Sequence, residues 1–169
     1  LEVMVSIAIL AVIVTMGAPS LAEFYERQKI RVGAETIASA LSMARSTALN
    51  ELIVTRLCWN SGTATRVVNG IDVTPGRLVV IKTAPVELLS NIAFNQAMFV
   101  DDTDADDCVS FDPQGRLDLA TVTGTELMFG VCKESGTLLD SFNVSVSQTG
   151  RATSRPNVMA NGSALINCV

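Results

Sequence analysis

The chain has 169 residues, no histidine and a formal net charge of −5. Because histidine is the commonest general base and a frequent metal ligand, its absence makes an enzyme or a metal centre an unfavoured interpretation, and no cofactor is implied. The acidic balance also argues against a head domain whose main task is to bind nucleic-acid phosphates. At this length we expect one globular head and no second core.

An apolar run without a charged residue extends from Val3 to Ala18, and Glu2 lies at its edge. As a helix this run would be about 24 Å long, against a hydrocarbon core of about 30 Å. We expect it to be a membrane-inserting helix, and its large apolar side chains are Val3, Val5, Ile7, Ile9, Leu10, Val12 and Ile13.

Glu2 is the predicted functional residue of this segment. A carboxylate beside a membrane-inserting helix is destabilising unless a cation pairs with it or it stays near the head groups. The alternative is a helix-initiating acid, which the helix dipole would stabilise by about 0.3–1 kcal/mol. For the whole run, the alternative is a permanent single-span anchor of an unrelated periplasmic protein.

An amphipathic stripe follows Pro19. Apolar residues recur at steps of four and three, which places them on one helical face: Ile30, Ala34, Ile37, Leu41, Ala44 and Ala48. One helix is therefore predicted from near Leu1 to about Asn50, loosened or kinked around Gly17–Pro19. We divide the chain into a hydrophobic helix over residues 1–27 and a head over residues 28–169.

The remainder of the chain is typical of short antiparallel strands. The expected strands are 52–59, 65–68, 78–83, 97–100, 109–111, 126–132 and 141–148. The second and third are predicted to form a hairpin around Asn69-Gly70 and Pro75-Gly76, and 112–115 a tight turn. The segment 149–162 is expected to be a loop. Together these features predict an α+β fold, with a long N-terminal helix packed on an antiparallel β-sandwich or roll.

Four cysteines are spaced too widely for the close pairs of a zinc site. An even number behind a membrane-inserting segment favours disulfides formed in an oxidising compartment such as a periplasm. Three pairings are open, and the sequence does not choose among them. We favour Cys58–Cys108 together with Cys132–Cys168, since the second bridge would tie the C-terminal tail to a strand.

Residues 1–11 (LEVMVSIAILA) resemble the N-terminus of type IV pilins and type II secretion pseudopilins. In that family a prepilin peptidase cuts before a short stretch that begins with phenylalanine, and a glutamate soon follows. Glu2 matches that glutamate and Pro19 the helix-breaking proline. The resemblance implies that about three mature residues, including an N-methylated amine, precede Leu1. It also implies that Glu2 neutralises the terminal amine of an adjacent subunit.

The head resembles the GspH/FimT branch of that family. The similar segments are 41–48 (LSMARSTA), 53–58, 111–116 (FDPQGR) and 144–151 (VSVSQTGR). A late cysteine pair like Cys132 and Cys168 is a feature of FimU-type minor pilins. The resemblance implies a non-enzymatic minor pilin, in a tip complex that primes pilus assembly. A minor pseudopilin of type II secretion is the second interpretation, and a DNA-binding pilin for natural transformation is the third.

The implied partners are other pilins or pseudopilins, the prepilin peptidase and the bacterial inner membrane. The protein would be single-pass there, with a periplasmic head, before it joins the pilus at the cell surface. Arg151 and Arg155 are the candidate DNA contacts, but their spacing departs from the Gly-Arg-x-Arg element of FimT-like proteins. Two arginines would neutralise only about two phosphates, so DNA binding is not favoured.

Two further features have simple interpretations. Five aspartates between residues 101 and 107 lack the central glycine and the twelfth-position acid of an EF-hand, so a solvated acidic loop is favoured over a calcium site. Trp59 is expected to be a core aromatic residue or to pack on a disulfide.

Overall fold

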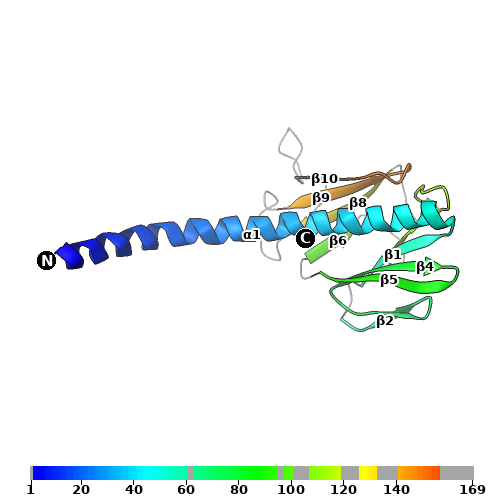
Figure 1. The fold of residues 1–169 in the computed structure, drawn as a ribbon, viewed down its shortest axis with the longest axis horizontal. Coiled ribbons are helices and arrows are strands. Elements are labelled where there is room, and N and C mark those ends of the chain that lie inside the picture. The colour runs from blue at the N-terminus through cyan, green and yellow to red at the C-terminus, as the bar shows by residue number, and fades with distance from the viewer. Residues whose placement is uncertain are drawn as a thin grey trace.

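The computed structural model describes residues 2–60, 63–94, 97–100, 107–118, 126–132 and 141–156. A single long helix, α1 (Glu2–Glu51), begins the chain and its second half crosses the head (Figure 1). The predicted helix is therefore confirmed. It is continuous through Gly17 and Pro19, so the proline does not end it. Leu52, in the left-handed region with φ 54°, follows the last helical residue.

Two four-stranded antiparallel sheets form the head, which confirms the α+β fold. The first sheet has the order β5-β4-β1-β7, and the second has the order β10-β9-β8-β6. The first comprises β1 (Thr55–Trp59), β4 (Arg77–Thr83), β5 (Val86–Ala93) and β7 (Cys108–Phe111). The second comprises β6 (Ala97–Val100), β8 (Glu126–Cys132), β9 (Phe142–Ser147) and β10 (Ala152–Pro156). A separate two-stranded hairpin of β2 (Arg66–Val68) and β3 (Ile71–Val73) packs against the first sheet.

The predicted hairpin between segments 65–68 and 78–83 is wrong. Strand β2 pairs with β3 across the Asn69-Gly70 turn, whereas β4 pairs with β1 and β5. Asn69 and Gly70 both have positive φ, and such a turn closes a two-residue hairpin directly. The turn signal at Asn69-Gly70 was correct, but its second strand is only three residues long and was not recognised.

Two other strands also differ from the prediction. The segment 149–162 is not wholly loop, because β10 occupies Ala152–Pro156, and β5 was not predicted at all. Both lie at the edge of a sheet, where one side of the backbone needs no partner and polar residues or proline are tolerated. The turn predicted at 112–115 is present, with the Gly115 amide donating to the Asp112 carbonyl over 2.8 Å and Gly115 at φ 69°.

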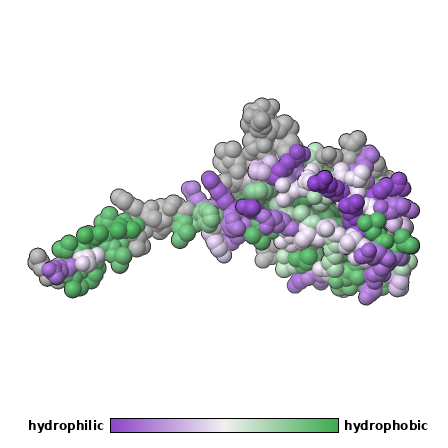
Figure 2. Space-filling model, turned by 45° about the horizontal axis from the view of Figure 1, so that its top comes forward, coloured by the Kyte–Doolittle hydropathy of each residue, from purple (hydrophilic) through white to green (hydrophobic). Residues whose placement is uncertain are grey.

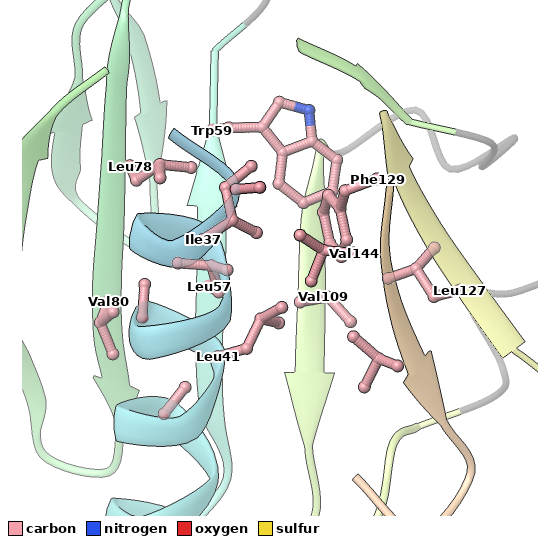
Figure 3. Close-up of a cluster of buried hydrophobic side chains, with 14 of the residues drawn as sticks. Ile37, Leu41, Leu57, Trp59, Leu78, Val80, Val109, Leu127, Phe129 and Val144 are labelled. Atoms are coloured by element: carbon pink, nitrogen blue, oxygen red, sulfur yellow. The ribbon is translucent and has the colours of Figure 1, made fainter. Parts of the chain in front are cut away.

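The helix buries the predicted apolar stripe against both sheets. All six of its residues are buried: Ile30, Ala34, Ile37, Leu41, Ala44 and Ala48. In Figure 3, Ile37 and Leu41 project between side chains of the first sheet, such as Leu57, and Val144 of the second. Trp59 is a core residue, as expected, and meets Phe129 edge-on with ring centroids 5.3 Å apart. The helix thus packs against both sheets and completes the core between them.

A second, smaller core lies on the other face of the first sheet. Cys58 and Cys108, on adjacent strands, form a disulfide there, as the favoured pairing predicted. The β2–β3 hairpin covers this bridge through Val68 and Val73. Cys132 is also disulfide-bonded, whereas its predicted partner Cys168 lies outside the described residues.

Candidate functional site: an exposed apolar helix

The first half of α1 extends away from the head and presents apolar side chains to its surroundings (Figures 1 and 2). We call residues 3–13 of this half the rod. Its large apolar side chains are between 52% and 77% exposed: Val3, Met4, Val5, Ile7, Ile9, Leu10, Val12 and Ile13. At about 100° per residue these positions surround the helix, and a helix that is apolar on all sides is normally buried. The rod is therefore a surface that needs a lipid or protein environment.

Glu2 stands exposed in the first turn of α1, immediately before the rod. The Ser6 hydroxyl donates to the Glu2 backbone carbonyl over 2.8 Å, and this bond does not involve the carboxylate. The carboxylate thus lies at the tip of the rod, available to a cation from outside the chain. Within the described residues, no helical stretch is both long and apolar enough to cross a lipid bilayer.

Between the rod and the fully docked part of the helix, residues 23–35 carry most of the charged side chains of α1, and we call this segment the neck. Two ion pairs lie along it, Glu26–Lys29 at 3.1 Å and Arg31–Glu35 at 3.0 Å. The Lys29 ammonium also lies 4.8 Å from the centroid of the Tyr25 ring. Exposed pairs of this kind stabilise by a few tenths of a kcal/mol, so the neck is mainly a solvated surface. Figure 2 shows it as a hydrophilic band beside the head.

The helix ends on an ion cluster at the first sheet. Lys82 of β4 contacts the carboxylates of Glu51, the last helical residue, and Glu87 of β5, at 2.9 and 3.0 Å. The hydrogen bonds that Lys82 donates to these two carboxylates raise the pKa of Lys82 above its ordinary value. Because the C-terminal end of a helix carries partial negative charge, the ammonium also offsets the unfavourable Glu51 position.

Three of the segments that resemble the GspH/FimT branch meet at one place. The Arg45 Nε of α1 donates to the Gly115 carbonyl over 3.1 Å, and Gly150 lies against both residues. The Leu117 amide donates to the Gln148 carbonyl over 3.1 Å, which ties the turn after β7 to the turn before β10. We call this contact the helix–head joint. Its residues fix the helix on the two sheets.

The structure places the remaining predicted site residues as follows. Arg151 and Arg155 are exposed, before and within the edge strand β10. They are four residues apart, which is about 13 Å along an extended backbone. Asp107 forms a 3.0 Å ion pair with Arg66, whereas Asp101, Asp102, Asp104 and Asp106 lie outside the described residues. Within the described part of the chain, no group of three or more acidic or cysteine side chains could hold a metal ion.

Comparison with known proteins agrees with this architecture. A family model described as type II transport protein GspH matches residues 33–150, which is more than half of the chain. The chain belongs to the GspH family. The match starts in the docked half of α1 and ends at Gly150, so it includes the helix–head joint.

Solved structures share the fold. The type IV minor pilin FimU of Pseudomonas aeruginosa, in crystal form P21, has a TM-score of 0.60 at 20% identity, over 86% of this chain and 99% of that one. Its P65 form has a TM-score of 0.56 at 18% identity, over 82% and 99%. No curated protein sequence matches the chain significantly.

The sequence predicted the apolar helix and the docked stripe, and the functional role of Glu2 stays a prediction; the polar contacts between the helix and the sheets were not predicted. The sequence does not indicate the ion cluster at Lys82, because its two carboxylate partners become neighbours only when the end of the helix meets the first sheet. Arg45 stands within a segment that carried the family resemblance, yet its role in the joint requires two loops that lie 70 or more residues away.

Proposed function

We propose that this protein is a non-enzymatic minor pilin of a type IV pilus, located in the tip complex that primes pilus assembly. The observation that carries the proposal is the rod, an all-round apolar helix extending from a folded head of the GspH family. Such a rod suits a subunit that is first held in a bilayer and later packed among equivalent helices. The fold shared with FimU, over 99% of that chain, supports a pilus over other assemblies.

The energetics of the transfer are consistent with this role. A lipid tail and a neighbouring apolar helix are similar environments for Ile9 or Leu10, so leaving the bilayer forfeits little hydrophobic free energy. The inner membrane is therefore the proposed location before assembly, with the head in the periplasm. Residues 28–169 act as the head and 1–27 as the anchor and filament core. Processing by a prepilin peptidase belongs to the same proposal.

Glu2 is the proposed assembly residue. In a bundle of apolar helices an unpaired terminal amine would be strongly destabilised, and a carboxylate from the adjacent subunit would neutralise it. The exposure of Glu2 at the tip of the rod leaves it accessible to such a partner. Pro19 follows the rod, and its missing amide hydrogen bond permits a bend between the anchor and the docked helix.

The test is incorporation of Glu2→Ala into filaments sheared from cells that produce the full-length precursor. We expect membrane insertion to be unchanged and incorporation to fall about tenfold or more, since loss of one member of a buried pair is severely destabilising. Glu23→Ala, the same change at an exposed position of the neck, serves as the matched control and should incorporate normally. Normal incorporation of Glu2→Ala would overturn the pairing role.

A minor pseudopilin of type II secretion is the second candidate, because the matching family is described as a type II transport protein. The two candidates differ in phenotype. Deletion of a minor pilin reduces the number of surface pili, whereas deletion of a pseudopilin retains secreted proteins in the periplasm. Normal pili together with blocked secretion would replace the first proposal by the second.

A further inference from the structure

The outer face of the first sheet, opposite the helix, is only half covered. The β2–β3 hairpin lies over the disulfide end of this face. Beside the tip of the hairpin, at Asn69, a groove of about 540 Å³ remains open. We call it the outer groove. It is lined by residues of four strands: Arg56 of β1, Thr83 of β4, Val86 of β5 and Ser110 of β7.

The groove contains the half-buried guanidinium of Arg56, which forms no ion pair with any residue that the structure describes. The Arg56 Nε donates to the Ser110 hydroxyl over 3.1 Å, and Ser110 is itself only 5% exposed. Among the described residues, Arg56 forms no ion pair within 4 Å, and its one hydrogen bond uses Nε and not the two Nη groups. By contrast, Arg66 and Arg116 of the same head both form ion pairs. Arg56 is thus held in place by its Nε while its Nη fork stays available for a bidentate partner.

The surroundings of Arg56 favour a protein carboxylate over a free or polymeric anion. Val54 and Val86 line the groove and are 37% and 51% exposed, so an apolar rim surrounds the cation. An arginine within an apolar rim is typical of protein–protein contacts. Asp118 also lines the groove and the chain has a net charge of −5, which together disfavour a polyanion such as DNA.

We propose that the outer groove binds an aspartate or glutamate side chain of a neighbouring pilin-family subunit, with Arg56 as its bidentate partner. The identity of the partner rests on the proposed function, whereas the carboxylate chemistry rests on the groove alone. Because the groove lies on the face opposite α1, this contact joins heads and is separate from the packing of the rods. It would fix the rotational register of one head against the next.

The test places the photoreactive residue p-benzoylphenylalanine at Val86 in the full-length chain and irradiates cells that carry filaments. We expect an adduct with a second pilin-family protein, and mass spectrometry should find an acidic residue beside the linked position. Arg56→Gln should reduce the adduct about tenfold, since removing one member of a close charge pair raises the dissociation constant by that order. Arg56→Lys keeps the charge but loses the fork, and an intermediate yield is expected.

Two controls keep the test interpretable. Arg77→Gln makes the same charge change on β4, where Arg77 is exposed and bonds to the Asn91 side chain, and should leave the adduct unchanged. Val54→Glu supplies a carboxylate from the chain itself at an exposed position, so it should suppress the adduct even if Arg56→Gln misfolds.

The outcomes separate the two proposals. An adduct that is insensitive to Arg56→Gln and Val54→Glu, or that forms with lipid or nucleic acid, would overturn the groove assignment. An Arg56-dependent adduct with a protein outside the pilin family would overturn the stated partner. Absence of the chain from sheared filaments would instead overturn the proposed function, whatever the adduct shows.

Discussion

At the scale of single residues, the helix–head joint depends on two glycines whose backbones approach each other. Gly150 has φ 75°, and a Cβ built on it would overlap the Gly115 carbonyl oxygen and lie 3.0 Å from the Arg45 side chain. A side chain here would therefore have to displace a backbone group as well as adopt a left-handed conformation. Gly115 is crowded as well, but a Cβ there would meet the flexible Leu49 side chain at 2.7 Å and not a backbone group.

Gly150→Ala should consequently lower the free energy of unfolding by about 3 kcal/mol or more, as the sum of left-handed strain and overpacking. Gly70→Ala is the matched control, because Gly70 has φ 80° but no atom lies within 4 Å of its would-be Cβ. Its expected loss is the strain alone, about 1–2 kcal/mol. Urea unfolding of the full chain in detergent measures both, and equal losses would show that the close approach does not matter.

At the scale of elements, the turn between β7 and the short bridge at Leu117 is stabilised by one carboxylate. The Asp112 Oδ1 accepts from the Gln114 and Arg116 amides at 3.0 and 2.8 Å, and its Oδ2 accepts from the Arg116 Nε at 3.1 Å. Partial burial by itself raises the pKa of Asp112, but the bonds and the charge of Arg116 outweigh it and hold the pKa below its ordinary value. The charged form is therefore the one that stabilises the turn.

Because folding lowers the pKa of Asp112, this carboxylate makes the folded state more stable at neutral pH than in acid. The contribution of Asp112 is fully present above its unfolded pKa of about 3.9 and is lost as the pH falls through the lower folded value. Asp112→Asn should lower stability at pH 7 by about 1 kcal/mol, and the difference from wild type should shrink below about pH 4. Asp72→Asn on β3 makes the same charge change at an exposed position. A pH-independent difference for Asp112→Asn would contradict the ionic origin.

Elements with a strong periodic or turn signal were predictable, whereas those fixed by tertiary pairing were not. The apolar steps from Ile30 to Ala48 require a helix face, and that face is buried throughout. Strands β8 and β6 were found with their observed bounds, since both are short apolar runs. Strand β5 begins after Pro85 and is largely exposed, so its strand character comes from pairing with β4 and not from its own pattern.

The candidate site divides in the same way. The apolar helix and the acid beside it could be predicted from the sequence, because an apolar run with one acid at its edge is a local pattern. The outer groove could not be predicted from the sequence, because Arg56, Ser110 and Thr83 become neighbours only through the pairing of β1 with β7 and β4. An isolated arginine in a strand does not by itself indicate a site for a carboxylate. Only the structure shows that Arg56 forms no ion pair with the described residues.

At the scale of the whole molecule, one helix serves two environments, and the boundary between them lies near Ile30. Among the residues of α1 whose exposure the structure describes, Ile30 is the first that is buried, and the large apolar residues before it are exposed. The docked half is thus part of the head's core, whereas the rod contributes apolar surface that the head does not use. Stability of the head and assembly of the filament should therefore be separable by mutation within this one element.

Two isoleucine-to-alanine variants test this separation. Ile37→Ala removes a side chain that is fully buried and should lower the melting temperature by about 10 °C, as expected for a loss of about 3 kcal/mol. Ile9→Ala, at a position 57% exposed in the rod, should leave the melting temperature unchanged and reduce filament incorporation severalfold, because the lost contacts exist only between subunits. Thermal unfolding in detergent and immunoblots of sheared filaments give the two readouts. A fall in melting temperature for Ile9→Ala would mean that the rod contributes to the folded head, and its role would then not be confined to assembly.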